Sequence, residues 1–501
     1  MFSLIIALSL LGVLVQPLPD GVLTNDEVSV EVRTGLFRWK KVPAMMALTA
    51  VGTGNGYVLP DSLKAEFGGI AKVPKVTRCA VASAGSRRSV RFRVRFPGMR
   101  EPQEARLSPG EKRIINPPGE YARCVVLEVH APRTGYSTEG YGTRIVFEAG
   151  YHTVANDPRI VPDSLGHPVV RVGDDTAVIL EEGAHVCASF DIRGSRHVRI
   201  CGKGFINLLE RCPGAENRFE GELWGAFRKG AVPAVYIHRG AADIRIEGIG
   251  IIADFRAVCG RCSEGISVKD VTMLTSAANG DGLSFINCRD VLVEDCLIHS
   301  QDDAFAVFNN CDSIRHLWDR DFEWPALSDG LTLRNCVLWT TCRPFCIGGH
   351  ATGNTAPRDT VRNITVEHCK VSQAYNLNMG RDEKSLDKLT FWGGAFRILS
   401  QSGQVVKGLA FRDVEYDWVP GYIGQPFHLC VRDGSRTSYG EKGGFSIEDV
   451  VFEDIRFLHV PEFHLPPYLK EPAETEPGGG LHRIVFRNIS FDGRVREIPG
   501  R

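Results

Sequence analysis

The sequence lacks an excess of either charge. Its 59 lysine and arginine residues are balanced by 60 aspartate and glutamate residues, which leaves a formal net charge of -1. Proteins that bind nucleic acids or anionic membrane surfaces usually carry a strongly basic region. The charge balance therefore excludes this electrostatic signature of a nucleic-acid partner and favours a small molecule or a neutral polymer.

Long hydrophobic runs are missing beyond the first residues. Ser3 to Val15 is almost wholly apolar, which is the length of a signal-peptide core and too short to cross a bilayer comfortably. We therefore expect residues 1–18 to be a signal peptide, the mature chain to have no membrane span, and the protein to be secreted or periplasmic. A non-cleaved apolar N-terminus is the alternative, because no basic residue precedes the run.

The sequence also shows no metal-ligand spacing and no nucleotide-binding loop, so we expect neither a metal nor another cofactor. It contains 15 cysteines, and Cys259 and Cys262 have no second cysteine pair at zinc-ligand spacing. A local disulfide or free thiols are the alternatives there. Cys296, Cys336 and Cys369 recur at one point of a repeated phrase, where we expect them to fill the interior.

That phrase is the main pattern of the chain. A charged or polar pair precedes a small or β-branched apolar residue, and alternating apolar residues precede the pair. The six copies are Glu294-Asp295-Cys296, Arg334-Asn335-Cys336, Glu367-His368-Cys369, Arg412-Asp413-Val414, Glu453-Asp454-Ile455 and Arg487-Asn488-Ile489. Variable separations are typical of one coil per repeat with loop insertions, which predicts an all-β, right-handed parallel β-helix.

Two other repeat folds fit less well. A β-propeller needs many tight hairpins, and Asn-Gly or Asp-Gly turns between alternating runs are too few here. A leucine-rich repeat needs a leucine lattice that the sequence lacks. Residues 165–498 are therefore predicted to form the β-helix.

The preceding residues have a different pattern. Val28 to Arg33, Ser89 to Phe96 and Val125 to His130 alternate apolar and polar residues between proline- and glycine-rich turns. This pattern favours an antiparallel sheet with one buried face. We expect a β-sandwich domain over residues 19–164.

Three aspartates begin two consecutive apolar strands of the predicted β-helix. Asn279-Gly280-Asp281-Gly282 precedes one strand, and Gln301-Asp302-Asp303-Ala304 precedes the next. Strands of successive coils stack about 4.8 Å apart, so the three carboxylates should lie close together. Each ionised neighbour raises the pKa of a carboxyl, which gives a reason for one of the three to keep a proton near neutral pH.

Five strands align over one another when they are placed by their turns: Leu283-Ser284-Phe285, Phe305-Ala306-Val307, Phe345-Cys346-Ile347, Phe396-Arg397-Ile398 and Phe427-His428-Leu429. The flanking columns are apolar and should face inward, so the middle column should face outward. Arg397 and His428 then share a sheet face with the aspartates, and Arg343 shares a column with Asp303. We expect this outward wall to form a binding cleft.

The motif Asn-x-Asp followed one coil later by Asp-Asp resembles the polygalacturonases of glycoside hydrolase family 28 and the dextranases and isopullulanase of family 49, which have the pectin lyase-like fold. The resemblance implies inverting hydrolysis, with Asp302 as general acid and with Asp281 and Asp303 holding the water. It also implies substrate binding by Asn279 and Arg397. Arg343 stands where the family has a histidine, and Gly348-Gly349-His350 lies seven residues later.

The lysine that meets a galacturonate carboxylate in family 28 is replaced here by Leu399. The resemblance therefore implies a neutral or mixed glycan rather than polygalacturonate. We expect an exported glycoside hydrolase, a monomer, that uses Asp281, Asp302 and Asp303 in catalysis and Asn279, Arg343, His350, Arg397 and His428 in substrate binding. A polysaccharide lyase with a calcium-binding acidic cluster and a non-catalytic carbohydrate-binding β-helix are the alternatives.

Overall fold

The computed structural model describes residues 13–501 with gaps. The residues outside this description are 1–12, 16, 21, 23, 26, 35–37, 52–75, 118–122, 132–135, 165, 209–231, 254, 276–279, 310–321, 323, 341, 350–358, 375–393, 402, 419–425, 432–443, 459–467 and 472–476. Regular structure in the described part consists of strands only. No helix there is suited to crossing a membrane.

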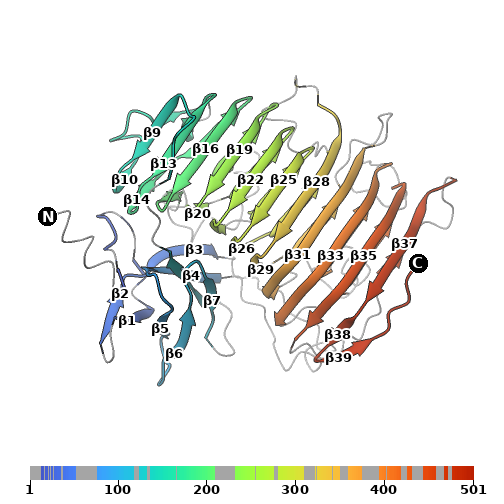
Figure 1. The fold of residues 1–501 in the computed structure, drawn as a ribbon, viewed down its shortest axis with the longest axis horizontal. Coiled ribbons are helices and arrows are strands. Elements are labelled where there is room, and N and C mark those ends of the chain that lie inside the picture. Colours follow the sequence, from blue (N-terminus) through green and yellow to red (C-terminus); the bar gives the residue numbers. More distant parts are fainter. Residues whose placement is uncertain are drawn as a thin grey trace.

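Residues from 143 onward form a stack of coils with two long sheets (Figure 1). The first sheet has 11 strands, which are β11 (Val161–Pro162), β12 (Pro168–Arg171), β15 (Ser189–Arg193), β18 (Val235–His238), β21 (Val258–Arg261), β24 (Leu283–Ile286), β27 (Phe305–Phe308), β30 (Phe345–Gly348), β32 (Phe396–Ser400), β34 (Phe427–Val431) and β36 (Tyr468–Lys470). Every pairing in it from β12 to β36 is parallel.

The second sheet has 20 strands. They are β9 (Thr143–Phe147), β10 (Gly150–His152), β13 (Thr176–Leu180), β14 (Ala184–Val186), β16 (Arg196–Gly202), β17 (Phe205–Asn207), β19 (Ala242–Glu247), β20 (Gly250–Ala253), β22 (Glu264–Lys269), β23 (Thr272–Thr275), β25 (Arg289–Glu294), β26 (Leu297–Ser300), β28 (Leu327–Arg334), β29 (Val337–Thr340), β31 (Thr360–Ala374), β33 (Val405–Trp418), β35 (Ser446–Phe457), β37 (Gly480–Arg487), β38 (Ile489–Phe491) and β39 (Arg494–Arg496). The terminal β38–β39 pair is antiparallel.

One coil consists of a strand in the first sheet followed by two strands in the second. β24, β25 and β26 form such a coil, and each pairs in parallel with its counterpart one coil later, β27, β28 and β29. The predicted parallel β-helix is therefore confirmed.

The repeated phrase forms the corner between the two second-sheet strands of a coil. Its middle residue has a positive φ in each copy: 57° at Asp295, 54° at Asn335, 53° at His368, 50° at Asp413, 56° at Asp454 and 50° at Asn488. Among residues with side chains, Asn, Asp and His enter this left-handed region most readily. The corner geometry explains why these residue types occupy the middle of the phrase.

The first residue of the phrase alternates in sign from coil to coil. In-register pairing places these six residues, Glu294, Arg334, Glu367, Arg412, Glu453 and Arg487, in one column that also contains Lys269 of the preceding coil. Glu294 lies between Lys269 and Arg334, with nitrogen–oxygen distances of 2.7 and 2.6 Å. We call this column the charge ladder.

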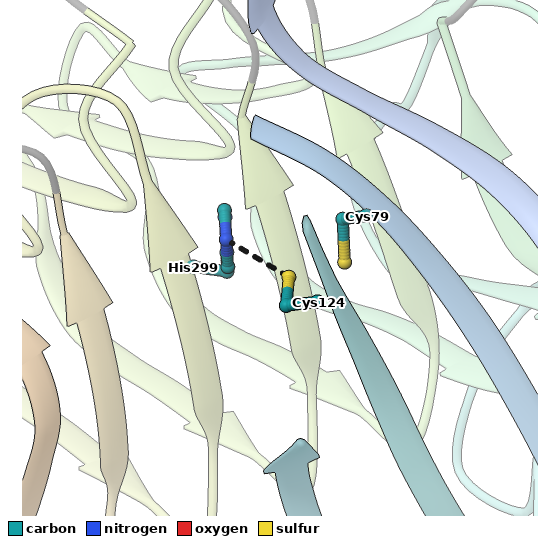
Figure 2. Close-up of side chains that lie close together, drawn as sticks. All are labelled: Cys79, Cys124 and His299. Atoms are coloured by element: carbon teal, nitrogen blue, oxygen red, sulfur yellow. Dashed lines mark hydrogen bonds between the residues drawn. The ribbon is translucent and has the colours of Figure 1, made fainter. Parts of the chain in front are cut away.

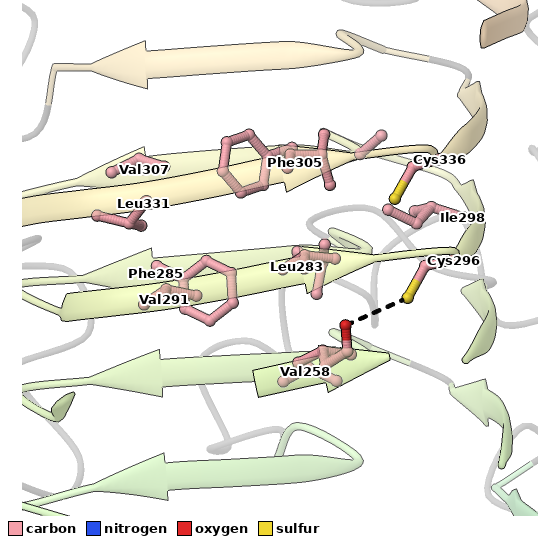
Figure 3. Close-up of a cluster of buried hydrophobic side chains, with 14 of the residues drawn as sticks. Val258, Leu283, Phe285, Val291, Cys296, Ile298, Phe305, Val307, Leu331 and Cys336 are labelled. Carbon is pink, nitrogen blue, oxygen red and sulfur yellow. Dashed lines mark hydrogen bonds between the residues drawn. The ribbon is translucent and has the colours of Figure 1, made fainter. Parts of the chain in front are cut away.

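The interior of the coils is filled by in-register apolar columns, part of which Figure 3 shows. Phe396 stacks on Phe345 and Phe427, with ring centroids 5.3 and 5.4 Å apart. Cys296, Cys336 and Cys369 are buried in the same core with free thiols, so the prediction that they fill the interior is confirmed. Cys259 and Cys262 are also buried and free.

The N-terminal part is a sandwich of two four-stranded sheets, as predicted. The third sheet contains β2 (Trp39–Val42), β1 (Ser29–Arg33), β5 (Val90–Arg95) and β6 (Gln103–Leu107), and the fourth contains β3 (Met45–Val51), β4 (Val76–Gly85), β8 (Arg123–His130) and β7 (Lys112–Ile115). Their shared core includes Phe92 from the third sheet and Leu127 from the fourth.

The sandwich is not wholly antiparallel, because β4 and β8 pair in parallel. Between them the chain crosses to the third sheet for β5 and β6 and then returns through β7. This excursion lets β8 run in the same direction as β4, as a crossover connection does.

The fourth sheet packs on the β-helix with its other face (Figure 1). Cys79, Val81, Cys124 and Val126 on that face lie in one buried cluster with Ile252, Leu274 and Leu297 from β20, β23 and β26. Lys112 and Asp270 pair at 3.0 Å beside this cluster. The fourth sheet therefore packs into the sandwich core with one face and against the β-helix with the other.

Candidate active site

Four ionisable residues of one column precede four successive strands of the first sheet. Arg256, Asp281, Asp303 and Arg343 each stand two residues before the first residue of β21, β24, β27 and β30. Their backbones are joined by hydrogen bonds from Ala257 N to Asp281 O (3.1 Å), from Gly282 N to Asp303 O (2.9 Å) and from Ala304 N to Arg343 O (2.9 Å). We call these four residues the acid row.

Within the acid row, each arginine contacts the adjacent aspartate. Arg256 Nε lies 3.1 Å from Asp281 Oδ2, and Arg343 Nε donates to Asp303 Oδ1 at 2.6 Å. The Ser284 hydroxyl donates a further hydrogen bond to Asp281 Oδ2. These contacts offset the cost of burying two carboxyl groups away from water.

Asp302 lies beside the acid row and is the most open of the three aspartates. Its side chain is 18% exposed, compared with 5% for Asp281 and 4% for Asp303. Its Oδ1 accepts a hydrogen bond from Asp303 N at 3.0 Å and lies 3.7 Å from Arg343 Nη2. Ser300 and Thr340 donate to its backbone carbonyl, which fixes the turn that presents it.

Burial raises the pKa of Asp281 to about 7. Arg256 opposes this rise, Asp302 and Asp303 add to it, and the hydrogen bond from Ser284 opposes it. The crowding of carboxyl groups expected from the sequence thus contributes to the raised pKa, but removal from water is the larger cause. Asp281 therefore retains a proton over much of the range in which an isolated aspartate is ionised.

The predicted alignment of five strands is confirmed. Ser284, Ala306, Cys346, Arg397 and His428 pair in register from β24 to β34. The column faces away from the coil interior, because Ala306 and Cys346 belong to a cluster separate from the core.

This outward column is nevertheless buried, which differs from the open wall that the sequence suggested. Arg397 is 2% exposed and His428 is 0% exposed. Arg397 Nη1 lies 3.0 Å from Cys346 Sγ. Burial, with Arg397 and Arg343 nearby, lowers the pKa of His428 well below its usual value, so its ring is neutral. Facing outward in a sheet does not guarantee exposure, because other parts of a chain can cover a sheet face.

Asn279 and His350, predicted to bind substrate, lie outside the described residues. Arg256 was not identified from the sequence. The sequence did contain a signal for it. Arg256-Ala257-Val258 has the same order as Asp281-Gly282-Leu283 and Asp303-Ala304-Phe305, namely a charged residue, a small residue and an apolar residue.

Asp302, Asp303 and Cys342 could offer three ligand atoms to a cation, since these atoms lie within 4.8 Å of one another. Arg343 contacts both aspartates, at 3.7 Å and 2.6 Å. A guanidinium already placed against both carboxyl groups disfavours a second positive charge there. The arrangement suits proton transfer and the binding of neutral hydroxyl groups better than the binding of calcium.

Comparison with known proteins gave no matching family model and no matching curated sequence. Among solved structures, the chain is similar to the family 28 exopolygalacturonase of Yersinia enterocolitica, with a TM-score of 0.43, 12% identity and coverage of 95% of this chain and 92% of that one. It is also similar to Dex49A from Penicillium minioluteum, with a TM-score of 0.44, 12% identity and coverage of 89% and 90%. Endo-xylogalacturonan hydrolase from Aspergillus tubingensis gives a TM-score of 0.42 and 12% identity, with coverage of 72% and 88%.

Proposed function

We propose that this protein is a glycoside hydrolase that cleaves a polysaccharide or oligosaccharide with inversion of the anomeric centre. The observation that carries the proposal is the grouping of Asp281, Asp302 and Asp303 on two adjacent coils, with two arginines flanking the buried pair. Inverting hydrolysis requires a protonated carboxyl at the leaving oxygen and a carboxylate that activates water on the opposite face of the sugar.

In this proposal Asp302 is the general acid, as the sequence motif implies, because it is the aspartate most open to a bound sugar. Asp281 and Asp303 hold the attacking water, which the ionised member of this pair deprotonates. The raised pKa of Asp281 makes it the second candidate for the proton donor.

The proposed substrate is a neutral or mixed glycan. Leu399 replaces the lysine that the resembling family uses for a galacturonate carboxylate, and it is buried and apolar here. Its side chain offers no positive charge to an acidic sugar. Arg397 and His428, which lie on the same outward sheet face as Leu399, are proposed to contribute to substrate binding.

The test is release of reducing sugar from a panel of neutral and acidic glycans, with the anomer of the first product followed by NMR. Asp302→Asn should lower the rate by about 10²–10⁴-fold. Asp295→Asn is the matched control, because it makes the same chemical change at an exposed corner of the neighbouring coil. Its rate should equal that of the wild type.

A substrate with an activated leaving group separates the two candidate acids. Such a substrate needs little protonation, so the variant that lacks the acid should recover most of its rate, and a variant that lacks the base should not. Recovery in Asp281→Asn instead of Asp302→Asn would reverse the assignment. A retained anomer, an unsaturated product lost with chelator, or glycan binding without cleavage would refute the inverting hydrolase.

A further inference from the structure

Two cysteines and a histidine from distant parts of the chain meet between the sandwich and the β-helix. Cys79 lies on β4, Cys124 on β8 and His299 on β26, and Figure 2 shows their side chains directed toward one another. Cys79 and Cys124 are directly paired in the parallel ladder of β4 and β8. Their thiol sulfurs and a ring nitrogen of His299 all lie within 4.8 Å of one another.

The spacing of these atoms matches that of ligands on a metal. Cys124 Sγ and His299 Nε2 are 3.5 Å apart. A tetrahedral zinc ion with a sulfur at about 2.3 Å and a nitrogen at about 2.0 Å places these two ligands about 3.5 Å from each other.

We infer that Cys79, Cys124 and His299 bind a zinc ion that joins the N-terminal sandwich to the β-helix. Two thiolates and a neutral imidazole around a divalent cation have no net charge. A neutral complex suits this position, because all three side chains are buried and the two cysteines lie in an apolar cluster that includes Met45, Leu274 and Leu297. Zinc binding would release the two thiol protons to solvent.

The histidine is prepared for this role. The ring of His299 is 0% exposed, so water does not compete for its nitrogens. The His299 ring stacks on the Trp339 ring with centroids 3.8 Å apart, and this stacking fixes the orientation of the imidazole.

Two simpler arrangements compete with a metal. One is a hydrogen bond from the Cys124 thiol to His299 Nε2, which the same 3.5 Å distance also permits. The other is oxidation of Cys79 and Cys124 to a disulfide. The first predicts two free thiols without metal, and the second predicts neither free thiols nor metal, so the three states can be separated by measurement.

The test is metal analysis of the full-length wild-type protein, purified without chelator and separated from unbound metal by gel filtration. We expect zinc in stoichiometric amount, and a cobalt-exchanged sample with the intense near-ultraviolet absorption of thiolate bound to cobalt. Cys79→Ser, Cys124→Ser and His299→Gln should each weaken zinc affinity by at least the roughly 10–100-fold that loss of an outer-shell partner costs. Cys336→Ser, a buried thiol within the coils, should retain it.

The wild-type measurements decide the question even if a variant fails to fold. Metal-free protein whose Cys79 and Cys124 are alkylated after unfolding would overturn the inference. So would an intact mass and peptide map that show a disulfide between these two cysteines. The outcome is independent of glycan hydrolysis, because neither cysteine belongs to the acid row.

Discussion

Asp281 is a buried acid whose ionisation opposes folding. Its pKa is about 7 in the folded protein and about 3.9 in an unfolded chain. The folded state therefore binds more protons than the unfolded state between these values, and this residue lowers stability as pH rises through that window.

We expect Asp281→Asn to gain stability relative to the wild type as pH rises from 5 to 8, by on the order of 1–3 kcal/mol. Chemical denaturation of both proteins across this range measures the difference. Glycan hydrolysis should be lost at every pH. A stability difference that does not change with pH would mean that Asp281 is ionised throughout.

Arg343 holds Asp303 in the acid row through a contact of 2.6 Å. Arg343→Met leaves a buried carboxyl without this partner and should cost about 3–5 kcal/mol of unfolding free energy. Adding Asp303→Asn should restore part of the loss, because the second change removes the isolated charge. A double-mutant cycle by urea denaturation gives the coupling energy, and additive effects would contradict the ion pair.

The sequence was sufficient to identify the three aspartates, Arg343 and the register of Arg397 with His428, since all of these follow from the coil period. It was not sufficient to predict that Arg397 and His428 are buried. A sheet face is covered by segments distant in sequence, and strand periodicity contains no information about them. The grouping of Cys79, Cys124 and His299 was not predicted for a similar reason, because these residues are separated by long stretches of chain.

At the scale of the element, the corner residue of each repeated phrase decides whether a coil can turn. Asn335 has a φ of 54° between β28 and β29. We expect Asn335→Val to cost about 1–2 kcal/mol, because a β-branched side chain clashes in the left-handed region. Asn335→Gly, the control, should change the free energy of unfolding by only a few tenths of a kcal/mol, since glycine favours this φ.

Thermal and urea unfolding of both Asn335 variants checks this prediction. Equal losses in the two variants would show that the side chain of Asn335, which lies 3.5 Å from Asp295 Oδ1, matters more than its backbone. The phrase was visible in the sequence because the corner restricts residue type so strongly. The strand bounds were less visible, because long strands such as β31 and β33 run through the corner without a break.

At the scale of the whole molecule, the fourth sheet couples the sandwich to the β-helix. Leu274 on β23 is 1% exposed and lies in one buried cluster with Cys79 and Val126 of that sheet. Leu274→Asp places an unpaired charge in this dry contact. We expect the wild type to unfold in one calorimetric transition, and we expect this transition to split in Leu274→Asp, with the sandwich melting first.

Val495→Asp is the control for this experiment, because Val495 is 63% exposed and the same kind of change there should leave the melting curve unaltered. Limited proteolysis should release sandwich fragments earlier from Leu274→Asp than from either other protein. An unsplit transition with an unchanged digestion pattern would mean that the sandwich and the β-helix melt as one unit without this contact.

Because of the charge ladder, the sign of the charge at this position depends on whether a coil is odd or even in the stack. The members of the ladder alternate in sign, from Lys269 through Glu294, Arg334 and Glu367 to Arg412. Deleting the coil that contains Arg334 would bring Glu294 against Glu367, whereas deleting the coils of both Arg334 and Glu367 would bring Glu294 against Arg412. Each contact is worth only about 0.2–1 kcal/mol, but deleting one coil replaces two attractive contacts by one repulsive contact, whereas deleting two coils leaves an attractive contact at the junction. This protein should therefore lengthen or shorten by two coils more readily than by one.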